Sequence, residues 1–119
     1  MASAETKALI AKAVEGLQKE VPALAQLKLV VKLELRAHGG AAPIWRVEVP
    51  GPKIDRDAAG DARIEVSVAR SHFNELAKEG RLKHWIAAYE RGHVRVTGES
   101  GLLKLLGSVI ERRQARARS

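Results

Sequence analysis

The residues in this sequence with the clearest capacity for chemistry are four histidines, His38, His72, His84 and His93. Histidine metal sites usually place two histidines two or four residues apart, often in a His-Glu-x-x-His motif. None of the four has another histidine at such a spacing. The sequence also has no cysteine, which excludes thiol chemistry and a cysteine-based zinc site. We therefore expect no metal site and no cofactor.

Motifs for nucleophilic catalysis and for phosphate binding are missing as well. There is no Gly-x-Ser-x-Gly motif, and the Gly39-Gly40 pair lacks the pattern of a phosphate loop and a helix after it. Ser100 is better placed to cap a helix than to act as a nucleophile. No pair of acidic residues falls on an apolar face, where burial would raise a carboxyl pKa. We therefore predict that the protein has no catalytic residues and is not an enzyme.

Apolar residues, by contrast, form clear periodic patterns, and the most informative one lies near the C-terminus. Residues 93–97 alternate between polar and apolar side chains, which predicts a strand with one buried face. A helix is expected directly afterwards, with an apolar stripe at helical spacing. This stripe consists of Leu102, Leu105, Leu106, Val109 and Ile110. Such a helix must close over something, and we expect it to cover an apolar cavity between a sheet and two earlier helices.

The remaining elements that would build this cavity follow from the same periodicities. Alternating patterns predict strands at residues 27–37, 45–49 and 62–68, with either a short edge strand or a loop around Ile54. Helical patterns occupy residues 5–20, 71–79 and 82–91, and glycines at 39–40 and 80 interrupt the chain. Strands joined by short turns are most simply antiparallel. We therefore predict an α+β fold, with a mainly antiparallel sheet of about five strands and helices packed on one face.

Size and charge suggest one domain with an uneven charge distribution. The 119 residues, 45% of them hydrophobic, are expected to form a single domain over 1–119. The net charge is +7, and residues 111–119 form a basic tail. This tail is either frayed or draws the protein to an anionic membrane surface through Arg112, Arg113, Arg116 and Arg118. The first residues lack the pattern of a signal peptide and no apolar run approaches a membrane span, so we expect a cytoplasmic protein.

The segment from Ala62 to Leu106 resembles the sterol carrier protein type-2 family. A strand at residues 64–68 precedes a helix containing Phe73, and a Gly-Arg-Leu turn at residues 80–82 follows. The next short helix carries Trp85 and two alanines, and residues 92–98 then form a strand bounded by glycines. The chain departs from the family at Tyr89, where a bulkier, charged sequence replaces the frequent Met-Ser-Gly. This departure is expected to narrow or fill the cavity.

The resemblance implies a five-stranded sheet, helices on one face, and an apolar tunnel that takes fatty acyl chains, sterols or related lipids, with the last helix as a lid. Together with the apolar face of the sheet, it predicts a set of ligand-binding residues. They are Leu33, Trp45, Val66, Phe73, Leu82, Trp85, Ile86, Tyr89, Leu102, Leu105, Leu106, Val109 and Ile110.

These observations favour non-catalytic binding or transfer of a lipid or another hydrophobic small molecule. Three alternatives remain open. The apolar residues could simply fill one another as an ordinary core, because pockets and cores use the same residue types. The basic C-terminal helix could bind nucleic acid, although the sheet lacks the basic residues with interleaved aromatics typical of a nucleic-acid surface. The apolar stripe could also be an interface with another protein or a second copy of the chain.

Overall fold

A computed structural model describes residues 2–37, 43–49, 51–56, 58–79 and 81–118. The elements are α1 (Ala2–Glu20), the 3-10 helix η1 (Pro22–Gln26), β1 (Leu29–Arg36), β2 (Ile44–Val49), β3 (Lys53–Arg56), β4 (Ile64–Ala69), α2 (Arg70–Glu79), α3 (Leu82–Glu90), β5 (Val94–Gly98) and α4 (Ser100–Arg118). Of the two alternatives predicted around Ile54, a short edge strand or a loop, the strand is present as β3. Predictions that concern His38, Gly39, Gly40 and Gly80 lie outside the described residues.

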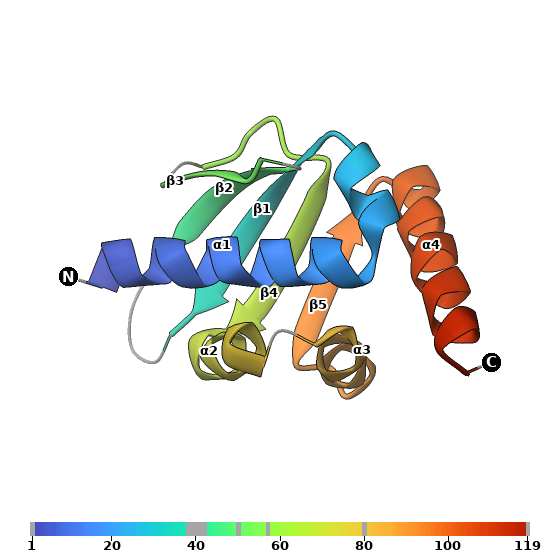
Figure 1. The fold of residues 1–119 in the computed structure, drawn as a ribbon. Coiled ribbons are helices and arrows are strands. Elements are labelled where there is room, and N and C mark those ends of the chain that lie inside the picture. The colour runs from blue at the N-terminus through green and yellow to red at the C-terminus, as the bar shows by residue number, and fades with distance from the viewer. Residues whose placement is uncertain (1, 38–42, 50, 57, 80, 119) are drawn as a thin grey trace.

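The five strands form one sheet in the order β3-β2-β1-β4-β5. Three neighbouring pairs are antiparallel, but β1 and β4 run parallel, with Val31 opposite Ile64 and Leu35 opposite Val68. The α+β class and the five strands are confirmed, and the sheet, although mainly antiparallel as predicted, is mixed because it contains one parallel pair. The short-turn argument failed because the chain leaves β3, crosses over and inserts β4 on the free side of β1 (Figure 1). There the six-residue β4 pairs along β1 and buries Ile64 and Val68, which the four-residue β3 is too short to match.

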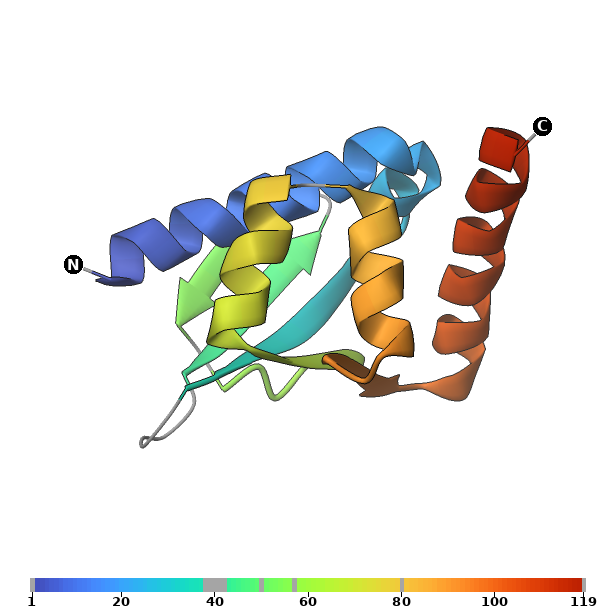
Figure 2. The same ribbon diagram turned by 90° about the horizontal axis from the view of Figure 1, so that it is seen from below.

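Helices α1, α2 and α3 lie on one side of the sheet, whereas α4 stands beside α3 at the end of the molecule (Figures 1 and 2). Helix α1 packs against α2 and β3, and α2 packs against β1 and β4. Helix α4 packs against the edge strand β5 and against η1. None of the helices in the described part of the chain is both long and apolar enough to cross a membrane.

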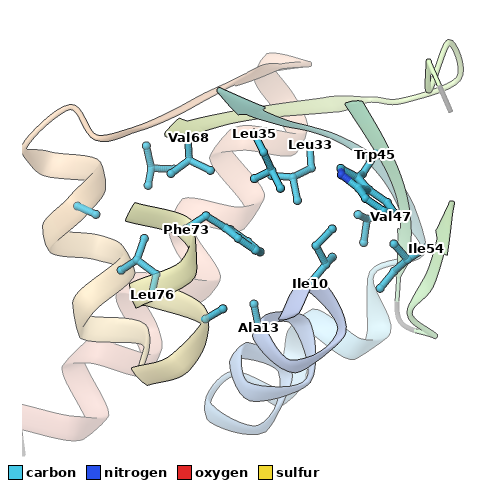
Figure 3. Close-up of a cluster of buried hydrophobic side chains, with 13 residues drawn as sticks. Ile10, Ala13, Leu33, Leu35, Trp45, Val47, Ile54, Val68, Phe73 and Leu76 are labelled. Carbon is cyan, nitrogen blue, oxygen red and sulfur yellow. The ribbon is translucent and has the colours of Figure 1, made fainter. Parts of the chain in front are cut away.

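The core fills the space between the sheet and the first two helices (Figure 3). Phe73 of α2 points into its centre, only 2% exposed, and the side chains of Leu33, Leu35 and Ile10 surround it. The full cluster of buried residues is Ile10, Ala13, Leu33, Leu35, Trp45, Val47, Ile54, Val68, Phe73, Leu76, Ala77, Ala88 and Val94. Apolar residues of the alternating strands and of the helices therefore meet here. We call this region, between the sheet and helices α1 and α2, the packed half.

The opposite face of the sheet carries charged residues of both signs, as its alternation predicts. Lys32 and Glu65 form a salt bridge of 3.0 Å between β1 and β4. Arg46 contacts Glu48 at 3.0 Å and Asp61 at 2.8 Å. The hydrogen bonds from Arg46 lower the pKa of Asp61 below its usual range. These pairs balance the charge, so the outer face is not a continuous basic surface.

Polar contacts fix the ends of α1 to the other two covering helices. The Glu20 carboxylate accepts a hydrogen bond from the Leu82 backbone N–H and lies 3.6 Å from the Arg81 guanidinium. Glu20 thereby satisfies a free N–H in the first turn of α3. At the other end of α1, the buried Thr6 hydroxyl accepts a 2.5 Å hydrogen bond from Arg70. The position of α3 over the sheet consequently depends on α1.

Helix α4 is anchored at its first residues by the start of β4. The Arg63 guanidinium pairs with the Glu99 carboxylate, and the Glu99 backbone N–H donates to the Arg63 carbonyl at 3.2 Å. The hydrogen bond from Arg63 to the Glu99 carboxylate raises the pKa of Arg63. Gly98 precedes this anchor with a φ of 150°, and a Cβ there would overlap the Arg63 carbonyl oxygen and lie 3.0 Å from Ile64 Cα. Only glycine allows the backbone at the end of β5 to approach the backbone at the start of β4 so closely.

Truncation of Phe73 to alanine should strongly destabilise the fold. Phe73→Ala leaves a cavity at the centre of the core, and we expect a loss of about 3–5 kcal/mol in the free energy of unfolding. Tyr89→Ala is the matched control, because Tyr89 is 56% exposed and its loss should cost less than about 1 kcal/mol. Urea unfolding followed by circular dichroism measures both values. Equal losses in the two variants would contradict the description of the core.

Alanine at Gly98, in the junction between β5 and α4, should destabilise the protein, whereas alanine at a glycine within helix α4 should not. Gly98→Ala forces a Cβ against the backbone of β4, so we expect a loss of about 1–3 kcal/mol in unfolding free energy. Gly107→Ala is the control, since no atom lies within 4 Å of a Cβ at that helical position. The control should stabilise the protein by about 0.5–1 kcal/mol, because alanine favours helix over glycine. A Gly98→Ala protein as stable as the unmodified protein would show that the close approach is absent.

Candidate functional site

The predicted ligand-binding residues separate into a buried set and a partly exposed set. Leu33, Trp45 and Phe73 belong to the packed core, and Leu82 is buried in the first turn of α3. These four side chains are covered by protein neighbours. They come from both the sheet and the helices, and they are buried because the helices pack against one face of the sheet.

The other predicted residues are incompletely covered. Val66 of β4 and Trp85 and Ile86 of α3 are half-buried, and Tyr89 is exposed. On α4, the residues of the predicted stripe are Leu102, Leu105, Leu106, Val109 and Ile110, which we call the α4 stripe. Four of them are half-buried, and Leu105 is 46% exposed. A surface helix normally buries its apolar stripe against the core, so the α4 stripe retains apolar surface that the described part of this chain does not cover.

Two aromatic residues connect the packed half to the α3 side of the molecule. The rings of Phe73 and Trp85 meet edge to face, with their centroids 6.0 Å apart. The indole Nε1 of Trp85 is buried and has no hydrogen-bond partner among the described residues. Trp85 thus marks the boundary at which close packing around Phe73 gives way to the half-buried residues of α3.

A groove of about 450 Å³ opens beside the first turns of α4, where η1, the start of β1 and the segment preceding β4 come together. We call it the η1–α4 groove. Its lining residues are Gln26, Leu27, Lys28, Leu29, Arg63, Glu99, Gly101, Leu102 and Leu105. Four leucines supply its apolar surface, and two of them belong to the α4 stripe. Its volume falls within the range of roughly 300–1,000 Å³ of small-molecule sites.

Most of the η1–α4 groove was missed by the sequence analysis. Leu27, Lys28 and Leu29 fell only within the alternating strand predicted at residues 27–37, and no binding role was predicted for Arg63 or Glu99. Their sequence signals are local, whereas the groove combines three stretches that are distant in the chain, at residues 26–29, 63 and 99–105. Only Leu102 and Leu105 carried a signal that associated them with a binding site.

A second groove of about 300 Å³ lies near the opposite edge of the sheet. It is lined by Ala4, Lys7, Trp45, Ile54, Asp55 and Arg56. The Arg56 guanidinium covers the Trp45 ring at 5.2 Å from its centroid, and Trp45 itself is almost fully buried. Trp45 is therefore separated from the α4 stripe, although both were predicted to line one cavity.

The three histidines that the structure describes each contact another side chain. The rings of His72 and His93 stack with centroids 4.2 Å apart, and His84 Nδ1 lies 2.9 Å from a Glu79 carboxylate oxygen. Within the described residues, no group of three or more histidine, aspartate and glutamate side chains is placed to hold a metal ion.

Comparisons with known proteins identify the fold. No family model matches the sequence, and no curated protein matches it. Among solved structures, the crystal structure of sterol carrier protein 2 like 2 from Aedes aegypti is similar, with a TM-score of 0.57 and 16% identity over 87% of this chain and 98% of that chain. The solution structure of palmitated SCP2L2 from the same organism has a TM-score of 0.57 and 18% identity, covering 83% of this chain and 91% of that one.

A third similar structure is sterol carrier protein domain 2 of Helicoverpa armigera, with a TM-score of 0.56 and 14% identity over 83% of this chain and 80% of that chain. At these identities the likeness concerns the arrangement of the backbone. The predicted resemblance is confirmed at that level: this chain has a sterol carrier protein type-2-like fold.

Proposed function

We propose that this protein binds or transfers a hydrophobic ligand, such as a fatty acyl chain, a sterol-like molecule or another lipid, without catalysing a reaction. The observation that carries the proposal is the incomplete burial of the α4 stripe beside the η1–α4 groove. When a ligand covers apolar surface on a helix, the removal of that surface from water contributes favourable free energy to binding. The same surface is difficult to explain as part of an ordinary core, because no residue of the α4 stripe belongs to the buried cluster.

The proposed site is shifted from the one expected from sequence. The region between the sheet and α1–α2 is filled by core side chains, so we place the ligand along α4. The α4 stripe would contact it together with Leu27 and Leu29, and Trp85, Ile86 and Tyr89 would extend the apolar surface toward α3. Val66, Phe73 and Leu82 would then support this surface from behind, while Leu33 and Trp45 would serve mainly in packing.

The energetics favour a ligand with a long apolar portion. Each buried methylene contributes about 0.8 kcal/mol, so a chain of about ten methylenes would contribute roughly 8 kcal/mol. Association costs an estimated 4–15 kcal/mol in lost freedom of motion. A short apolar molecule would therefore bind weakly, whereas an acyl chain that spans the α4 stripe can offset this cost. The palmitated state of one structural neighbour supports the same ligand class.

The basic end of α4 suggests how the protein would reach its ligand. Helix α4 continues beyond the stripe to Arg118, so the basic segment containing Arg112, Arg113, Arg116 and Arg118 belongs to the same helix as the stripe. Basic residues near an anionic membrane contribute about 1 kcal/mol each. We propose that this end of α4 attracts the protein to such a surface, where a lipid can exchange. The cytoplasmic location stays a prediction.

Lipid binding can be tested by titrating the protein with Nile red and displacing the dye with dodecanoate. The double variant Leu102→Gln/Leu106→Gln should bind at least about tenfold more weakly, because it places two polar groups in the α4 stripe. Ile44→Gln is the matched control, since Ile44 is a half-buried apolar residue on the outer face of the sheet, and it should bind normally. Binding should also persist in 1 M salt.

Two results would contradict the proposal. One is the absence of saturable dye or dodecanoate binding by the unmodified protein. The other is binding to duplex DNA with a steep negative salt dependence and no lipid binding, which would favour a nucleic-acid module. Light scattering on the same variants addresses self-association: a dimer that dissociates in Leu102→Gln/Leu106→Gln would assign the α4 stripe to an interface between copies.

A further inference from the structure

The η1–α4 groove is lined by both apolar and charged residues. Leu27, Leu29, Leu102 and Leu105 contribute its apolar lining, from the start of β1 on one side and from α4 on the other. Lys28 lies between the first two leucines in sequence and is exposed. Lys28 is itself among the residues that line the groove, so a cation borders the groove beside apolar surface.

The charges that line the groove are not equivalent. Arg63 is paired with Glu99, so its charge is compensated within the protein. Lys28 forms no salt bridge with any described residue. An anion that enters the groove would therefore find one available cation, and the Gln26 amide can donate a hydrogen bond to the same group.

We propose that Lys28 is a specificity-determining residue, which selects amphiphiles with a carboxylate head over neutral or cationic amphiphiles of the same chain length. The head contacts Lys28 at the groove, and the tail lies on Leu27, Leu29 and the α4 stripe. This assignment rests on the proposed lipid-binding function and adds a preference that the fold alone does not require. A single acyl chain suits the groove, because about 450 Å³ lies near the lower end of small-molecule sites, roughly 300–1,000 Å³.

The test compares three probes with the same tail, dodecanoate, dodecanol and dodecyltrimethylammonium, by displacement of Nile red. The two ionic probes are used below their critical micelle concentrations, and dodecanol is used below its solubility limit. An exposed ion pair contributes about 0.2–1 kcal/mol, so the unmodified protein should prefer dodecanoate over dodecanol by up to about fivefold. Lys28→Gln should abolish this preference, and Lys28→Glu should transfer it to dodecyltrimethylammonium. Lys53→Gln is the matched control, because Lys53 is an exposed lysine on β3, at the opposite edge of the sheet, and should leave the preference unchanged.

The outcomes separate this inference from the function on which it rests. If all variants bind dodecanol and the ratio of carboxylate to alcohol affinity is the same in Lys28→Gln as in the unmodified protein, the role of Lys28 is wrong and lipid binding stands. An equal change in Lys53→Gln would also overturn it, because the preference would then reflect net charge. If the unmodified protein binds none of the three probes, both proposals fail. Circular dichroism of each variant confirms that the fold is retained.

Discussion

The close packing of apolar side chains between the sheet and helices α1 and α2 is the constraint on which the rest of the structure depends. Phe73 lies at its centre, and the buried cluster around it takes side chains from all five strands as well as from the helices. Interiors are packed at the density of organic crystals, so the cluster around Phe73 leaves little room for a ligand, and the second groove lies at the β3 edge of this region. Among the described residues, the exposed large apolar side chains are Tyr89 and Leu105, which lie on α3 and α4.

Much of the fold could be predicted from the sequence because its signals are local. Polar–apolar alternation predicted β1, β2, β4 and β5, and apolar residues at helical spacing predicted α1, α2, α3 and α4. Both patterns depend only on residues that are close in the sequence. The parallel pairing of β1 with β4 could not be predicted in this way. It depends on the relative lengths of β3 and β4 and on a crossover, which are tertiary properties. The order of the strands in the sheet likewise depends on which strand gains the most free energy by burying its apolar side chains beside β1.

The candidate site was predicted less completely, for a related reason. A stripe such as that of α4 has the same sequence pattern whether it is buried or partly open. The position of α4 is determined instead by the close approach of Gly98 to the backbone of β4 and by the pairing of Arg63 with Glu99. Neither contact has a signal in the sequence, because the partners are far apart in the chain. The η1–α4 groove follows from this anchoring, and so Leu27, Lys28 and Leu29 were missed.

The molecule thus has a packed half that provides stability and an α4 side that retains apolar surface, where we propose that a ligand binds. Methyl-selective NMR with dodecanoate tests this division most directly, by nuclear Overhauser contacts between the acyl chain and assigned protein methyl groups. The account predicts contacts to the methyl groups of Leu27, Leu102 and Leu105, and none to Ile10 or Leu35. Contacts to Ile10 and Leu35 would place the ligand inside the packed half and contradict the account.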